Sequence, residues 1–548
     1  MDQDPSAVSR RDLLKLAGAA AGAGAAGGWV DLLRPGPAAG QTPKRGGTIR
    51  LAGFDAPHFD PHQTPHWWTF IYTSLTHGGL VRHKAGPSVT PGTLPIEPHL
   101  AESWDRPNDT TYIFKLRKGV RFHAKPPVNG REMTAEDVVF TFQRALTIKG
   151  NPIRAAFEEI DKVEALDRHT VRFTMKEPFA WFLESPALAG ILPKEAADKD
   201  GFFKSPETVI GTGPWMLERY EPNVRLSFVR NPHYFQPGLP YVDAIEFRID
   251  TDPASKLAAW LSGQYDFAPE IHMTFQRSDL EVVKRRKPNL QTAEYTWLIS
   301  TLAVPKLEAE PLRDVRVRRA LHMAVNLTEV IKVNPMGYGH GSANPLVPAA
   351  LTEWAIPIGQ LTPEGRQLYE ADPEGARRLL AQAGQSGLKF PVESSGTWGT
   401  AFSDVVQAIL SEWKRAGIET ELKLKEGNAF IASSLARNFE KMIITLRGGA
   451  TTPDPYLMNL LPGRPQNTAG VNDAKLNEMI LLQRRTFDEK KRREIIFDIQ
   501  RHFAQYAYQL FVSPAARVIS AWEPYVRNFA PNIGNDYGGR LMGVWLDK

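Results

Sequence analysis

The chain of 548 residues contains no cysteine. Disulfides, thiolate zinc sites, iron–sulfur clusters and cysteine nucleophiles are therefore excluded. A lipoprotein anchor is excluded as well, because it is attached to a cysteine at the cleavage site. We expect a protein that needs no cofactor and is not held at a membrane by a lipid.

The sequence also has little net charge. The formal charge is +5, a small basic excess for this length and without the dense basic stripe that binds nucleic acid. The motifs G-x-S-x-G, H-E-x-x-H and G-x-x-x-x-G-K-[ST] are absent, and acidic pairs such as Glu158-Glu159 are expected by chance among 61 acidic residues. We predict no nucleic-acid partner and no enzymatic activity; a secreted hydrolase is the less favoured alternative.

The first forty residues have the features of an export signal. Arg10 and Arg11 precede an apolar run at 16–30 that is rich in alanine and glycine. Paired arginines before such a run resemble the twin-arginine signals of bacteria. At about 1.5 Å per residue the run reaches roughly 22 Å, short of the ~30 Å hydrocarbon core. We predict a cleaved signal peptide at 1–40 and a periplasmic mature protein; a disordered basic tail is the alternative.

Several helices have clear start and end signals. Thr134 with Asp137 forms a capping-box pattern, and Asp-Pro pairs at 252–253 and 372–373 place a capping carboxylate before a proline. Glycines at 263 and 384 should end the helices that begin at these two Asp-Pro pairs.

Strands alternate with these helices. A strand is expected at 48–52, and alternation of apolar with polar residues predicts strands with one apolar face at 112–116, 171–175 and 418–424. A helix should begin at Ser403, directly before the strand at 418. Helix, short turn and strand repeated along the chain predict an α/β architecture with helices covering the sheets.

Eight different segments along the chain are informative about its family when they are taken together in their order. They are residues 97–104, 112–123, 133–141, 211–215, 230–235, 263–267, 314–321 and 372–384. In this order they resemble the family 5 extracellular solute-binding proteins, the peptide, nickel and opine binders of ABC importers. The likeness covers about residues 46–530. It implies a two-lobed periplasmic-binding-protein fold, of the class with an extra inserted domain, with a cleft between the lobes.

The resemblance also implies a domain order. Lobe I would comprise residues 41–84, 206–300 and 514–548, with the inserted domain of lobe I at 85–205 and lobe II at 301–513. Within it, 211–214 reads as a tight turn that needs the permissive backbone of glycine.

Three histidines precede an aromatic cluster in the first loop. His58, His62 and His66 are four residues apart and would share one face of a helix, where they could hold a metal. A proline directly precedes each of them and forbids that helix, so we expect an extended loop. A metal or chelate site stays the alternative, because some relatives bind nickel complexes.

Aromatic residues follow this loop, which in the family borders the cleft. Aromatic faces suit apolar, sugar or cationic ligands. We predict ligand contacts from His66, Trp67 and Trp68, and include Trp398 in the set. The alternative is that alternate members fill the core of the large lobe.

The segment 447–460 departs from the peptide-binding relatives. Those carry a tryptophan seven residues, and an aspartate four residues, before the proline of an Asp-Pro pair, and that aspartate binds the peptide's ammonium group. Counting from Pro455, these positions are Gly448 and Thr451. A neutral hydroxyl leaves a buried ammonium unpaired, which costs several kcal/mol, on the order of 3–5. We therefore expect a ligand other than an ordinary peptide.

Two charged residues of this segment are further candidates. Arg447 could offer its forked donors to a carboxylate or phosphate, although a surface ion pair explains it equally well. Asp454, three residues from Thr451, is included among the predicted ligand contacts.

The predicted function is capture of a small solute by lobe closure, through a shift of population toward the closed form, and delivery to an ABC permease. The expected partners are the permease subunits, met transiently by a monomer. A ligand-sensing protein that reports to a membrane receptor is the alternative.

Export gives the first test. Replacing Arg10 and Arg11 by lysine should trap the precursor in the cytoplasm, because the paired arginines are the recognised feature of the signal. Immunoblots of periplasmic and cytoplasmic fractions measure this, and normal export of the variant would contradict the twin-arginine assignment.

Overall fold

The computed structural model describes residues 42–548 except 199, 271–274, 276, 334–345, 399 and 514–516. The predicted signal peptide at 1–40 lies outside the described residues. Within the described part, no helix combines the length and the apolar character that crossing a membrane requires.

One four-stranded sheet contains the first strand of the chain. Its order is β1-β10-β9-β8, with β1 parallel to β10 and the other pairs antiparallel. Its strands are β1 (Thr48–Gly53), β8 (Trp215–Glu221), β9 (Arg225–Arg230) and β10 (Ala244–Ile249). Helix α2 (Trp67–Thr76) packs beside β8 and against α15 (Tyr537–Leu541). The apolar core under this sheet thus joins both ends of the chain.

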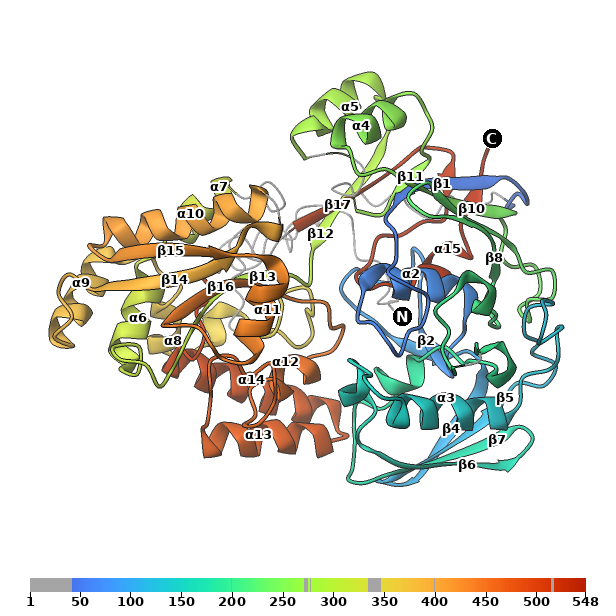
Figure 1. Ribbon diagram of the computed structural model, residues 1–548, viewed down its shortest axis with the longest axis horizontal. Helices are drawn as coiled ribbons and strands as arrows, with labels where there is room; N and C mark the ends of the chain where they lie inside the picture. Colours follow the sequence, from blue (N-terminus) through green and yellow to red (C-terminus); the bar gives the residue numbers. More distant parts are fainter. Residues whose placement is uncertain are drawn as a thin grey trace, which may run out of the picture. The chain divides into compact units, whose positions relative to one another are not determined.

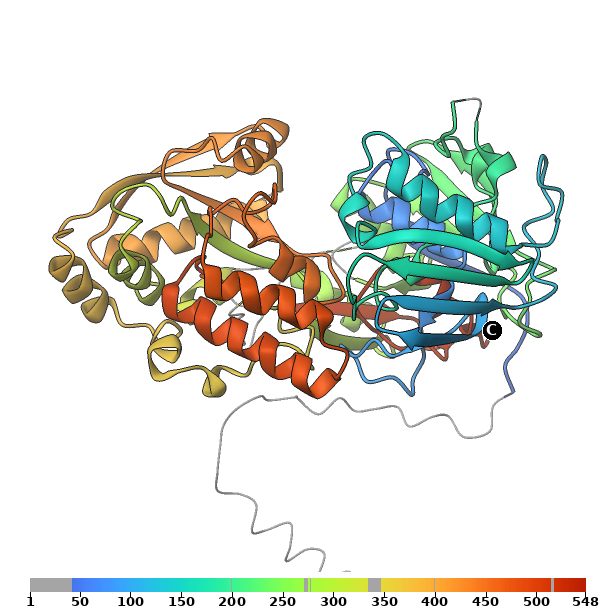
Figure 2. The same cartoon turned by 90° about the horizontal axis from the view of Figure 1, so that it is seen from below.

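A second sheet is wholly antiparallel, with the order β4-β5-β7-β6. Its strands are β4 (Ala101–Asn108), β5 (Thr111–Leu116), β6 (Ile160–Asp167) and β7 (Thr170–Met175). Helix α3 (Ala135–Thr147) lies across this sheet (Figure 2). The hairpin of β2 (Val81–His83) and β3 (Ile96–Pro98) precedes it.

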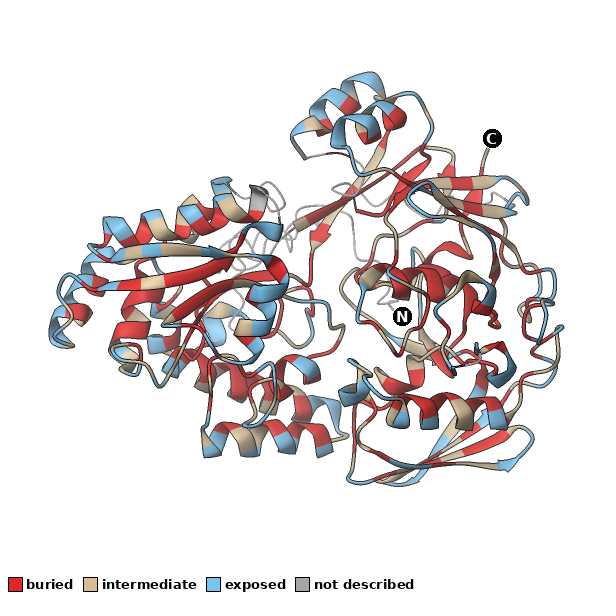
Figure 3. Cartoon of the chain, in the orientation of Figure 1, coloured by how far each residue is buried: buried red, intermediate tan, exposed pale blue. Residues whose placement is uncertain are grey.

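A third sheet has the order β13-β16-β14-β15, with β14 parallel to both of its neighbours. Its strands are β13 (Ser300–Pro305), β14 (Lys389–Ser395), β15 (Glu419–Lys425) and β16 (Met442–Arg447). The surrounding helices are α6 (Val315–Met323), α7 (Leu327–Val333), α8 (Pro363–Gln367), α9 (Pro373–Gln382), α10 (Thr400–Arg415) and α11 (Gly427–Leu435). Buried residues concentrate on β13, β16 and β14, while β15 has none and α9 and α10 expose one side (Figure 3).

A small sheet, β11-β17-β12, adjoins the point where the chain passes into the third sheet. Its strands are β11 (Phe267–Ala268), β12 (Gln291–Thr296) and β17 (Arg517–Trp522), and β12 and β17 run side by side (Figure 1). The remaining elements are α4 (Pro253–Leu261), α5 (Leu280–Arg286), α12 (Asp454–Met458), α13 (Ala474–Arg485), α14 (Glu489–Tyr506), β18 (Val526–Arg527) and β19 (Trp545–Leu546).

The predicted helix signals at three sites are confirmed. The Asp252 side chain accepts from the Ser255 amide at 2.7 Å, and Asp372 accepts from the Gly375 amide at the same distance. Thr134 and Asp137 form the capping box of α3. Glycines at 263 and 384 have φ of +77° and +70° just after their helices, where a side chain would be strained.

Three expectations need correction. Helix α10 begins at Thr400 rather than Ser403. The apolar row at 418–424 is not buried throughout: Leu424 is 63% exposed, because β15 is an edge strand. The glycines at 211 and 213 are required by close packing rather than by positive φ, since a Cβ on Gly211 would lie 2.1 Å from the Thr76 carbonyl oxygen at the end of α2.

The core of the third sheet gives a stability test. Trp413 is fully buried and its indole N–H donates to the Leu321 carbonyl at 2.7 Å. Trp413→Ala should lower the free energy of unfolding by about 3–5 kcal/mol, through a cavity and a lost hydrogen bond. Urea denaturation measures it. Leu424→Ala, at the exposed position, is the matched control and should change the value by less than about 0.5 kcal/mol.

Candidate functional site

Helix α2 presents two different faces. One face packs into the core of the β1-β10-β9-β8 sheet through residues spaced three and four apart, Trp68, Ile71, Tyr72 and Leu75. The opposite face lines a cavity with Phe70, Thr73, Ser74 and, just beyond the helix, His77. The amphipathic spacing of α2 therefore places one wall of the cavity.

The cavity has a volume of about 290 Å³, close to the lower end of the roughly 300–1,000 Å³ usual for small-molecule pockets. Segments far apart in the sequence form its wall, namely α2, residues 79–85, 153–157 and 185–190, the C-terminal segment 532–542, and Thr451. Much of this wall is apolar, and such a lining suits a small solute with an apolar body.

The polar groups in the wall include Asn532 and Asp536. The Asn532 amide oxygen accepts from the Gly92 and Ile533 amides, and its amide group donates to the Thr93 carbonyl at 3.0 Å. Asp536 accepts from the Gly539 amide at 2.8 Å, and burial raises the pKa of its carboxyl. Asn532 thus fastens the C-terminal segment, and burial favours the neutral form of Asp536.

Thr451 is the predicted site residue that lines the cavity. Thr451 lies in the loop after β16, opposite Gly534. A Cβ atom added to Gly534 would be 3.4 Å from the methyl group of Thr451. Gly534 has φ of +98°, so a side chain there would be strained. This approach brings Thr451, in the loop that follows β16 of the third sheet, to the cavity that α2 also lines.

Arg447, the last residue of β16, has neutral partners. Its guanidinium donates to the Gln509 side-chain oxygen at 2.8 Å and to the Tyr456 carbonyl, and lies 5.4 Å from the centre of the Tyr456 ring. Burial lowers the pKa of Arg447 to about 10. Both hydrogen-bond partners of Arg447 among the described residues are uncharged. The alternative explanation of Arg447, an ion pair at the surface, therefore has no support among the described residues.

Asp454 has charged and polar partners that hold it in place. Its carboxylate accepts from the Gln483 amide at 2.8 Å and from the Arg484 Nε at 3.2 Å. Arg484 also donates to Glu159 at 2.5 Å. Burial raises the pKa of Asp454, and the charge of Arg484 opposes this. The carboxylate is thus already engaged by α13.

The aromatic candidates lie in three settings. The Trp68 side chain is buried and packs against Phe54, Tyr72 and Phe247. The Trp67 ring meets Trp297 edge-on at 5.8 Å, and its buried N–H has no partner among the described residues. Trp398 stands half-buried between Phe402 and Phe430, and His66 is exposed at the start of α2. The predicted residues therefore do not meet at one point, and as a set they stay a prediction.

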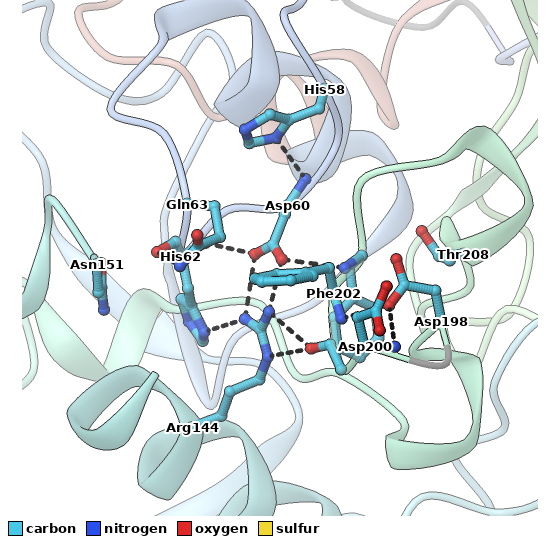
Figure 4. A network of polar contacts seen from close by, with 12 residues as sticks. His58, Asp60, His62, Gln63, Arg144, Asn151, Asp198, Asp200, Phe202 and Thr208 are labelled. Atoms are coloured by element: carbon cyan, nitrogen blue, oxygen red, sulfur yellow. Dashed lines mark hydrogen bonds and ion pairs between the residues drawn. The ribbon is translucent and has the colours of Figure 1, made fainter. Parts of the chain in front are cut away.

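The histidines of the first loop do not converge on one point. His62 is buried and faces Arg144, whereas the His58 Nδ1 accepts from the Asp60 amide at 3.2 Å (Figure 4). In the described part of the chain, no three His, Cys, Asp or Glu side chains lie together in a way that could hold a metal ion.

Comparison with known proteins identifies the family. Residues 95–468 match the model of the bacterial extracellular solute-binding proteins, family 5. The chain belongs to this family. The predicted family, the two-lobed fold and the function as a solute-binding protein are confirmed.

Individual relatives cover most of this solute-binding protein. It is 29% identical over 519 residues to the dipeptide-binding protein of Pseudomonas aeruginosa, covering 87% of this chain and 92% of that protein. It is 30% identical to heme-binding protein A of Haemophilus influenzae, covering 71% and 74%. Among solved structures, the substrate-binding protein CtaP of Listeria monocytogenes has a TM-score of 0.77 at 22% identity, covering 92% and 100%.

Sequence reasoning missed most of the wall of the cavity in this solute-binding protein. Residues 532–536 carry no motif, and residues 153–157 and 185–190 have no pattern that separates them from ordinary loops. His62 could have been found, because its spacing from His58 and His66 had already marked it.

Proposed function

We propose that this solute-binding protein is exported by the twin-arginine route, loses residues 1–40, and acts in the periplasm as a monomer with no catalytic step. It captures a small solute between its lobes and delivers it to the permease subunits of an ABC importer. The paired arginines, the lack of cysteine and the extracellular family support this proposal.

The observation that carries the proposal is the composition of the cavity wall. We place lobe I at 41–84, 206–300 and 514–548, its inserted domain at 85–205, and lobe II at 301–513. Thr451 then comes from lobe II, and the rest of the wall from lobe I and its insertion. A solute in the cavity touches both lobes, so it stabilises the closed form by its differential affinity.

A second group of contacts crosses the same proposed boundary. The Trp181 indole N–H donates to the Gln483 side chain at 2.8 Å, and Arg484 bonds to Glu159. Because Arg484 also holds Asp454, closure of the lobes would complete the environment of the loop that carries Thr451.

The proposed ligand contacts follow from these positions. We propose that Thr451 contacts the solute directly and that His66, Trp67, Trp398 and Arg447 contribute to the cleft around it. Trp68 and Asp454 belong to the proposed site through the elements they hold, since Trp68 packs α2 against Phe247 of β10 and Asp454 anchors the Thr451 loop to α13.

Relatives of similar identity are named for different ligands. Di/tripeptide-binding protein 3 of Pseudomonas aeruginosa and heme-binding protein A of Haemophilus influenzae are each 30% identical to this chain. Overall similarity thus does not decide the ligand, and local residues must. Thr451 supplies no charge, and Asp454, the nearest substitute, is engaged by Arg484. We propose a solute other than an ordinary peptide with a free amino terminus.

Solute capture is tested on the protein as purified. Mass spectrometry of the native protein should reveal a copurifying small molecule, and removing it should raise the radius of gyration in solution scattering, because the solute holds the lobes closed. Returning it at a hundredfold excess over Kd should stabilise the native state by about 2.7 kcal/mol.

Thr451→Trp, which fills the cavity, should abolish copurification, and Leu424→Ala, far from the cavity, should leave it intact. An unchanged radius of gyration with saturating solute would remove the closure mechanism.

The ligand class is tested by restoring the missing charge. Wild-type protein should show no thermal shift with dipeptides at micromolar concentration. Thr451→Asp should gain dipeptide affinity of about 10- to 150-fold, since a hydrogen bond to a charged group contributes about 1.5–3 kcal/mol.

Thr451→Asn, of similar size but neutral, is the matched control and should gain nothing. A dipeptide that binds tightly to the wild type and is lost in Asp536→Asn would overturn the proposal, because it would show that Asp536 takes the ammonium group.

A further inference from the structure

His62 is a buried side chain that the proposed function does not use. It lies in the loop between β1 and α2, is 2% exposed, and lines the cavity. The sequence marked it as one of three spaced histidines, yet in the described part of the chain the three do not lie together as a group that could hold a metal ion. Its position at the cavity raises the question of what its ring presents to a solute.

Arg144 of α3 determines which nitrogen of the His62 ring carries the proton. Its Nη1 lies 2.9 Å from the His62 Nδ1 (Figure 4). A guanidinium has only donors, so the His62 Nδ1 must be the acceptor and carry no proton. The neutral ring then carries its proton on Nε2. Burial, with the charge of Arg144, lowers the pKa of His62 to about 4, so the ring is neutral at pH 7.

Arg144 cannot easily turn away from this contact. Its two terminal nitrogens bond to the Asp60 carboxylate at 3.1 and 2.5 Å, and Nη2 also donates to the Gly201 carbonyl at 3.1 Å. Asp60 in turn accepts from the His62 and Phe203 amides, at 2.9 and 3.0 Å. Because both members of the ion pair are buried and multiply bonded, the direction of the His62 ring is set by the fold.

The surroundings of the ring at the cavity are apolar. Phe157 meets the His62 ring edge-on at 5.9 Å, and Phe70, Ile153 and Ala156 line the same cavity. The hydrogen bond with Arg144 uses Nδ1, which leaves Nε2–H as the ring's donor. Because His62 lines the cavity, a solute atom that accepts this hydrogen gains a hydrogen bond there.

We propose that the His62 Nε2–H group donates to an oxygen acceptor of the bound solute, a carbonyl, carboxylate or ether oxygen next to an apolar or aromatic body. Arg144 and Asp60 are positioning residues that hold the ring with Nε2–H toward the cavity. An ammonium group has only donors and is rejected at this position. This inference rests on the proposed function, since it takes the cavity to be where the solute binds.

The first experiment reads the tautomer directly. In full-length mature protein labelled with ¹⁵N-histidine, NMR at pH 7 should show His62 with a bare Nδ1 and a protonated Nε2, assigned by the signal missing from His62→Gln. A ring protonated on Nδ1 would overturn the inference, and this result does not depend on any ligand or on a variant that folds poorly.

The second experiment uses two probes that share a skeleton. Acetophenone carries a carbonyl acceptor, and 1-phenylethylamine carries an ammonium in its place. In titrations followed by NMR, acetophenone should bind the wild type and the amine should not.

Variants of His62 then separate its role from general packing. His62→Leu should weaken acetophenone binding about five- to tenfold, because the donor is lost. His62→Gln keeps an acceptor for Arg144 and a donor for the cavity, and should retain most of the affinity. Equal binding of both probes, failure of acetophenone to bind the wild type, or unchanged affinity in His62→Leu would each overturn the inference.

These outcomes are separable from those for the proposed function. If a strain lacking the protein still imports the copurifying solute at the normal rate, the proposed function fails whatever His62 does. If import depends on the protein but His62→Leu supports it fully, only the inference about His62 falls.

Discussion

The buried ion pair between Asp60 and Arg144 is the interaction on which the arrangement of the site depends. It joins the loop before α2 to α3, and so links the β1-β10-β9-β8 sheet to the β4-β5-β7-β6 sheet. A buried pair of this kind adds little net stability over an apolar replacement, but losing one partner leaves an uncompensated charge and costs about 3–5 kcal/mol. The ion pair matters here for its geometry. It fixes the loop before α2, and this loop sets where α2 begins and which face of α2 meets the cavity.

Features whose interaction partners lie within a few residues along the chain could be predicted from the sequence. The caps at Asp252 and Asp372 bond to amides three residues away, so the pattern contains the whole interaction. The requirement for glycine at 211 depends on α2, which is far away in the sequence, and the sequence alone suggested a turn instead. The exposure of Leu424 likewise depends on β15 lying at the edge of its sheet, which alternation of residue types does not reveal.

The same difference between local and long-range interactions decided which parts of the candidate site could be predicted. Thr451 was found because the family's register could be counted from Pro455, a local argument. The engagement of Asp454 by Arg484 was not visible, because thirty positions separate partners that only tertiary packing brings together. The neutral state of His62 depends on burial and on a guanidinium supplied by another element, so the regular spacing of three histidines in the predicted extended loop gave no sign of it.

The core beneath the first sheet has a consequence for the order of events during synthesis. Ile49 and Leu51 of β1 share that core with Val544 and Leu546, and Lys44 pairs with Asp547 at 2.6 Å. The earliest strand therefore cannot complete its packing until residues more than four hundred positions later have left the ribosome. A translocase that accepts finished, folded cargo matches such a delayed closure of the core.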